Sequence, residues 1–266
     1  MHSKTLKHAR QGLESNPEWV RWSQEDPLWA VAAEPGRKRG EARAWTDEEF
    51  YAAGKSDWED FVRHWTQYGV SAKTCVEVGC GAGRITRQMA DYFNELHAVD
   101  VSPHMIERAR LAEAREHVRY WVTDGQTLPQ EDGSVQAIFS THVFQHVDSE
   151  EIVLAYFREL FRVLDTGGTL MIHMPLYDWP GVGRIAMILK SVHKTLLMIS
   201  DGLAWTKRKL QLRMMRGTAC NMRSVYETLT RLGFRDIEFR TFPTTRNGVL
   251  HPFVLARKSS IRTEEQ

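Results

Sequence analysis

Three glycines within five residues dominate the stretch TCVEVGCGAGRITRQM, which runs from Thr74 to Met89. Gly79, Gly81 and Gly83 separate an apolar segment from an amphipathic one. Glycine in such a position indicates a turn that a side chain would obstruct, or a backbone that another group approaches closely. The stretch therefore predicts a buried strand, a tight loop and a helix, with a ligand or a neighbouring element pressed against the loop.

Short apolar runs alternate with helical patterns from about residue 71 to residue 174, which is typical of a parallel α/β sheet. Ser102 is the expected N-cap of one helix, with Pro103 as its first residue. Asp148 and Glu151 have capping-box spacing at the start of another. A helix ending at Gly233 and two further strands follow near the C-terminus. The strands expected in the core are 74–78, 96–101, 118–124, 135–140 and 169–174.

Two regions depart from this alternation. Residues 1–70 hold six of the nine tryptophans and predict an N-terminal helical cap. Tyr51 and Trp58 in this cap either close over a binding site at the edge of the sheet or, as we favour, pack the cap onto the sheet. Residues 175–220 read as an inserted lid, apolar and basic together. The expected organisation is thus a Trp-rich cap (1–70), a core (71–174), an insertion (175–220) and a C-terminal part of the core sheet (221–266).

Composition narrows the classes of partner. The formal net charge of +1 over 266 residues gives no global reason to expect DNA or another polyanion. The three cysteines lack metal-ligand spacing, and we interpret them as reduced thiols. The sequence shows neither the apolar core of a signal peptide nor a run of transmembrane length, which predicts a cytoplasmic protein. The sequence does not indicate an oligomeric state.

The glycine spacing excludes two phosphate-binding loops. No Lys-Ser or Lys-Thr pair follows, and Arg84 stands where the dinucleotide motif requires its third glycine. Glu77, two residues before the first glycine, favours a positively charged ligand such as the sulfonium and ammonium groups of S-adenosylmethionine. Asp100 ends the second strand, where a carboxylate can accept hydrogen bonds from ribose, and Asp124 ends the third, where it can bind an adenine amino group.

Taken together, these residues resemble the class I S-adenosylmethionine-dependent methyltransferases, especially the small-molecule branch with a ubiquinone-biosynthesis-like core. The resemblance covers about residues 70–174 and rests on VEVGCGAGRIT, AVDVSPHMIERAR, VTDGQTLP, AIFSTHVFQHV and LFRVLDTGGTLMIHM. It implies a Rossmann-like, doubly wound sheet of seven strands, one of them antiparallel. It also implies cofactor contacts at Glu77, Gly79, Cys80, Gly81, Asp100, Val101, Asp124, Gly125 and Thr141.

His142 is the predicted catalytic residue, because a general base assists methylation of a hydroxyl and histidine suits neutral pH. A polar loop residue or a cap is the competing interpretation of His142, and a structural role is favoured for His146. Some quinone-type relatives of this core place two acids and a histidine across this segment. Here the matching positions are His142, Gln145 and His146, without a carboxylate, so we expect no required metal.

The resulting hypothesis is an S-adenosylmethionine-dependent methyltransferase acting on a small molecule, at oxygen of a secondary metabolite, sugar or lipid-linked compound. The alternatives are an RNA methyltransferase, disfavoured by the charge and the lack of an appended RNA-binding module, and a catalytically silent cofactor-binding partner protein. A nicotinamide-dependent oxidoreductase is disfavoured by the glycine spacing. Residues 184–216 are basic and apolar, and a lid with a solvated face is favoured over contact with a membrane surface.

Overall fold

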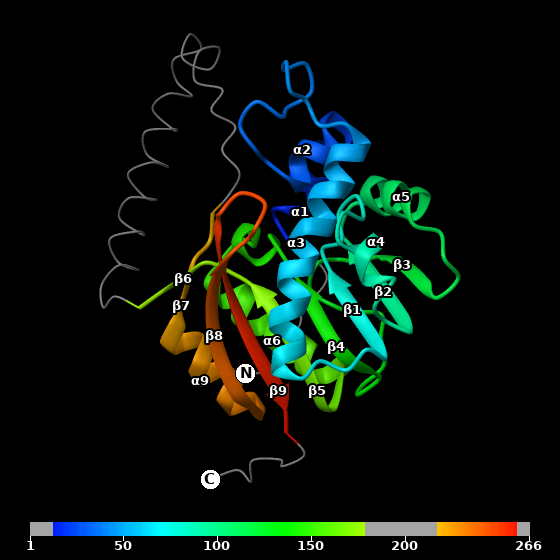
Figure 1. Cartoon of the computed structure of the whole chain (residues 1–266). Coiled ribbons are helices and arrows are strands. Elements are labelled where there is room, and N and C mark those ends of the chain that lie inside the picture. The colour runs from blue at the N-terminus through cyan, green and yellow to red at the C-terminus, as the bar shows by residue number, and fades with distance from the viewer. Residues whose placement is uncertain (1–12, 179–216, 260–266) are drawn as a thin grey trace, which may run out of the picture.

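A seven-stranded sheet forms the centre of the computed structural model, which describes residues 13–178 and 217–259 (Figure 1). The strand order is β3-β2-β1-β4-β5-β9-β8. The first five strands of that order pair in parallel, and β9 is antiparallel to both β5 and β8. This confirms the expected seven strands with one antiparallel strand. The strands are β1 (Thr74–Val78), β2 (Glu95–Asp100), β3 (Val118–Val122), β4 (Val135–Ser140), β5 (Leu164–His173), β8 (Phe234–Pro243) and β9 (Leu250–Lys258), beside a separate pair β6 (Leu176–Tyr177) and β7 (Cys220–Asn221).

Helices cover both faces of the sheet, as a doubly wound fold requires. On one face α3 (Asp47–Tyr68), α4 (Thr86–Met89) and α5 (Pro103–Ala112) pack against the strands, and Trp58 and Trp65 of α3 contact Phe139. On the other face α6 (Glu150–Val163) and α9 (Met222–Leu232) bury their apolar sides. Because β1, β4 and the second half of β5 are buried on both faces, these strands read as apolar runs in the sequence, whereas the edge strand β3 is partly exposed.

Helix boundaries follow the capping signals with two differences. Ser102 Oγ accepts the backbone N–H of Met105 at the start of α5, as expected. The capping-box prediction at Asp148 is wrong, because Ser149 is the N-cap of α6 and Asp148 instead accepts the backbone N–H of Glu14. The helix expected after the glycine loop is only the four residues of α4, and a turn carries the chain onward to Phe93.

Two short helices, α1 (Asn16–Glu25) and α2 (Pro27–Val31), lie above the carboxyl ends of the parallel strands (Figure 1). Trp22 and Leu28 are buried there against Phe50 at the start of α3 and against Met105 of α5. This arrangement places part of the Trp-rich region over the edge of the sheet where ligands bind in such folds. Most of the predicted lid lies in residues 179–216, outside the described residues.

Within residues 13–178 and 217–259, none of the helices combines the length and the hydropathy that a membrane-crossing segment needs.

Candidate functional site

The glycine loop that follows β1 is in contact with protein side chains on both sides. Gly79 and Gly81 have φ values of +74° and +53°, a region that side chains rarely adopt. A Cβ at Gly79 would lie 2.1 Å from Val143, and one at Gly81 would lie 2.6 Å from Val31 of α2. The glycines therefore allow the N-terminal cap and the segment after β4 to close over the loop.

Asp100 joins the end of β2 to this loop. Its Oδ2 accepts the backbone N–H of Gly81 at 2.9 Å, and its Oδ1 accepts the backbone N–H of Ser102 at 2.9 Å. Burial raises the pKa of the Asp100 carboxyl, while these two hydrogen bonds act in the opposite direction. The carboxylate lines the cavity described below, so its remaining lone pairs are available to a ligand.

Glu77 and Cys80 face away from the cavity. The Glu77 carboxylate is 3% exposed and accepts the hydroxyl of Thr86 at 2.5 Å, which ties β1 to α4. Burial raises the pKa of Glu77 to about 7. The Cys80 thiol packs against Ala98 and Ala109, and burial raises its pKa. Both residues thus support the loop from behind.

Asp124 is occupied by the turn that follows β3. Its Oδ1 accepts the backbone N–H groups of Gln126 and Thr127, each at 2.8 Å, and the Thr127 hydroxyl at 3.0 Å. The side-chain amide of Asn16 donates to the Asp124 backbone oxygen at 2.8 Å. The neighbouring Gly125 lines the cavity and Asp124 does not. Its predicted contact with an adenine amino group stays a prediction.

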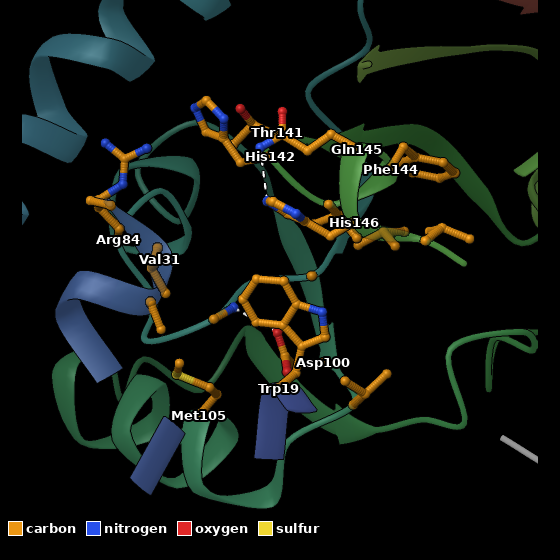
Figure 2. A pocket seen from close by; sticks show the side chains of 18 of the residues that line it. Trp19, Val31, Arg84, Asp100, Met105, Thr141, His142, Phe144, Gln145 and His146 are labelled. Atoms are coloured by element: carbon orange, nitrogen blue, oxygen red, sulfur yellow. Dashed lines mark hydrogen bonds between the residues drawn. The ribbon is translucent and has the colours of Figure 1, made fainter. Parts of the chain in front are cut away.

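A cavity of about 380 Å³ opens at the carboxyl edge of the sheet between the loop and the cap. Figure 2 shows side chains of the cap and of the end of β2 on one side and of the segment after β4 on the other: Trp19, Val31, Asp100 and Met105, and then Thr141, His142, Phe144, Gln145 and His146. The Trp19 ring lies 4.9 Å from the His146 ring, centroid to centroid. Of the nine predicted cofactor residues, six line the cavity: Gly79, Gly81, Asp100, Val101, Gly125 and Thr141.

His142 follows β4 and also lines the cavity. Its φ is +59°, a conformation that is uncommon for a residue other than glycine. Its backbone N–H donates to Nδ1 of His173 at 3.3 Å. Burial, and then the neighbouring His173, hold the pKa of His142 well below its usual value. His142 is therefore neutral, the form that can accept a proton or bind a metal ion.

The far end of the cavity is lined by paired charges. Arg84 donates to Asp57 at 2.5 Å, and both side chains are almost fully buried. Arg246 donates to Asp57 at 3.1 Å and to Glu34 at 2.5 Å. The sequence did not point to this network, because its members are distant along the chain: Arg84 is 27 residues from Asp57 and Arg246 is 189 residues from it.

The cavity suits an adenosyl amino acid. Asp100 offers a carboxylate at the end of β2, and Val101 and Met105 add apolar surface beside it. Thr141 Oγ1 is buried and has no hydrogen-bond partner among the described residues, which suits the polar amino-acid end of such a ligand. The glycine loop leaves no side chain between these groups.

The core of the chain is similar to known methyltransferase domains. Residues 76–172 match the family described as methyltransferase domain. Phosphoethanolamine N-methyltransferase 2 of Caenorhabditis elegans is 34% identical over 107 residues, which are 38% of this chain and 24% of that protein. The malonyl-acyl-carrier-protein O-methyltransferase of Hahella chejuensis is 38% identical over 99 residues, which are 36% of this chain and 34% of that protein. The match therefore spans about a quarter to a third of the length of these relatives.

A solved structure extends the likeness to nearly the whole fold. Magnesium protoporphyrin IX methyltransferase from Synechocystis, determined with bound S-adenosylmethionine, superposes with a TM-score of 0.58 at 14% identity. The superposition covers 93% of this chain and 98% of that one. Fold, loop and cavity together define a class I S-adenosylmethionine-dependent methyltransferase domain. The match of residues 76–172 to the methyltransferase domain family, together with the bound cofactor of the solved structure, indicates S-adenosylmethionine as the cofactor.

Proposed function

We propose that the protein transfers a methyl group from S-adenosylmethionine to a small-molecule acceptor, at oxygen. The observation that carries the proposal is a cavity that has the Asp100 carboxylate in one part of its wall and Arg84, His142 and Arg246 at its polar end. Its volume of about 380 Å³ falls at the lower end of the range of small-molecule pockets, about 300–1,000 Å³. An acceptor that shares this space with the cofactor is small, which favours a metabolite over a polymer such as RNA.

The cofactor, when bound, supplies an electrophilic methyl group on sulfur. The protein's own residues would position it: Asp100 and the glycine loop would hold the nucleoside part, and Thr141 would meet the amino-acid part. The cap residues Trp19 and Val31 cover the cavity and limit the access of water. Methyl transfer depends chiefly on this alignment and on dry surroundings.

His142 is the group proposed to face the acceptor hydroxyl. It lines the same cavity as Asp100, and its neutral imidazole can accept a hydrogen bond from an acceptor O–H. The burial that keeps it neutral also reduces its affinity for a proton, so His142 alone is a weak base at neutral pH. The acceptor class within this proposal is a hydroxyl compound of a secondary metabolite, sugar or lipid-linked type.

Calorimetric titration with S-adenosylhomocysteine, with NAD as the control, tests the cofactor part. We expect micromolar binding of S-adenosylhomocysteine and none of NAD. Methyl-labelled S-adenosylmethionine is then incubated with hydroxyl, amine and RNA acceptors in parallel. Label in a hydroxyl compound supports the proposal, label in an amine corrects the acceptor atom, and label in RNA alone overturns the small-molecule assignment. Cofactor binding with no label in any class would favour a silent partner protein.

A further inference from the structure

Three histidines meet at the acceptor end of the cavity. His142, His173 and His251 each offer a ring nitrogen, and these nitrogens lie within 4.8 Å of one another. Their ring centroids are 4.7 to 5.3 Å apart. We propose that His142, His173 and His251 form a binding site for a divalent transition-metal ion, which holds the acceptor oxygen. The proposal rests on the proposed methyltransferase function for the role of the ion, but not for its binding.

The topology of the sheet brings these residues together. His142 comes shortly after β4, and His173 is the last residue of the neighbouring β5. His251 is near the start of β9, which runs antiparallel to β5, so the beginning of β9 lies at the carboxyl edge of the parallel strands. All three side chains therefore reach one edge of the sheet from three adjacent strands, a rigid frame for a metal site.

The ring nitrogens are disposed to bind a cation. His173 Nδ1 accepts the backbone N–H of His142 at 3.3 Å, so its lone pair is on Nδ1 and its proton on Nε2. Nδ1 can therefore bind an ion without a change of tautomer, in exchange for one long hydrogen bond. His251 is 5% exposed, and its Nδ1 is buried without a hydrogen-bond partner among the described residues. A buried nitrogen without a partner requires an explanation, and a metal ion supplies one.

Neutral surroundings permit a cation here. The charged side chains that act on His142 and His251 are Arg84, Arg246, Asp57 and Asp60, and Glu34 is paired with Arg246. Asp60 is in turn paired with Arg63, so the acids compensate the positive charges. An ion would therefore meet no uncompensated positive charge.

The ligand set selects the type of metal. Imidazole nitrogen suits zinc, iron, nickel and copper, whereas magnesium and calcium prefer oxygen. Three histidine ligands with an open position are typical of catalytic zinc sites. His142 and His251 line the cavity and His173 does not, so the open position faces the acceptor. Metal–nitrogen bonds of about 2.0–2.1 Å bring tetrahedral ligands to roughly 3.4 Å of one another, so binding requires modest side-chain rotation.

The ion would account for the weak basicity of His142. A hydroxyl bound to a divalent metal gives up its proton at a lower pH, because the positive charge stabilises the alkoxide. The methyl group would then move from the sulfonium sulfur to that oxygen: the new C–O bond forms as the S–C bond breaks, and the proton leaves to solvent. His142 acts in this scheme as a ligand rather than as the proton acceptor.

Titration of the chelator-treated protein with Co²⁺ tests the site directly, because cobalt in a site with few ligands gives visible absorption bands. The titration uses protein without a histidine tag. The variants are His142→Asn, which tolerates the positive φ, and His251→Phe, which preserves the ring packing. His104→Gln, at an exposed position of α5, is the matched control. We expect one Co²⁺ per chain, displaced by Zn²⁺, and about 100-fold weaker binding or more in each variant of the cluster.

Two outcomes overturn the site: no stoichiometric Co²⁺ or Zn²⁺ binding by the parent protein, or equal binding by His142→Asn and His251→Phe. Circular dichroism of each variant establishes that it folds. S-adenosylhomocysteine affinity is measured on the same metal-free samples. Cofactor binding without metal binding removes the metal site and leaves the proposed function intact. Metal binding without cofactor binding removes the proposed function and leaves the site.

Discussion

Asp100 is the residue whose sequence position and structural contacts agree best. It was predicted from its place at the end of the second strand, and its carboxylate lines the cavity while holding Gly81. We expect Asp100→Asn to weaken S-adenosylhomocysteine binding about 10- to 150-fold, because a hydrogen bond to a charged group contributes roughly 1.5–3 kcal/mol. Calorimetry measures the affinity. Asp124→Asn is the comparison variant. An equal loss of affinity in Asp124→Asn would show that Asp124 also contacts the cofactor, as predicted for the adenine amino group, although it does not line the cavity.

The buried Glu77 carboxyl makes the stability of the folded protein decrease as the pH rises. Its folded-state pKa of about 7 lies above the usual 4.5, so the folded protein holds the proton more tightly than the unfolded chain does. The free energy of unfolding therefore falls as pH rises from about 4.5 to 7, by on the order of 3 kcal/mol from this group, and is then constant.

The Glu77→Gln variant checks this sign. Its neutral amide can still accept the Thr86 hydroxyl, so the pH-dependent loss between about 4.5 and 7 should be absent from its urea unfolding curves. A parent protein that instead gains stability from this group over the same interval would show that Glu77 is ionised and stabilised in the folded state.

At the scale of elements, a glycine in the middle of α3 lets the helix approach the glycine loop. A Cβ at Gly54 would lie 2.3 Å from the backbone oxygen of Arg84. Glycine to alanine in a helix normally stabilises by about 1 kcal/mol. Here we expect Gly54→Ala to destabilise by about 1–3 kcal/mol, because the obstructing atom is backbone. Urea unfolding measures it, with Lys55→Ala on the exposed side of the helix as control. Greater stability in Gly54→Ala would show that the helix and loop can separate freely.

Element boundaries were predictable where a local signal stands alone. Ser102 before Pro103 and Gly233 after α9 mark helix ends as expected. The start of α6 was misplaced by one residue, since Asp148 and Ser149 are both good caps and only the folded chain gives Asp148 another partner, the backbone of Glu14. A local sequence pattern does not reveal a hydrogen-bond partner that lies 134 residues away along the chain.

At the scale of the whole molecule, the N-terminal cap completes a site that the core alone leaves open. Trp19 lines the cavity and contacts the His146 ring. We expect Trp19→Ala to weaken S-adenosylhomocysteine binding up to about tenfold, since an aromatic contact contributes roughly 0.5–1.5 kcal/mol. Trp121→Ala, at the half-exposed edge strand β3, is the control. Similar losses in the two variants would mean that removal of any tryptophan, rather than of the cap, disturbs the site.

The strand–loop–helix repeat, the sheet edge at which the cavity opens and the place of Asp100 beside it were all predictable from the sequence, because they depend on residues close together along the chain. The packing of Trp58 onto the sheet, the favoured interpretation of this residue, is also found. Only the tertiary structure brought His142, His173 and His251 together and paired Arg84 with Asp57 and Arg246. Such contacts join strands and loops far apart in sequence, and no local periodicity records which side chains will share one end of a cavity.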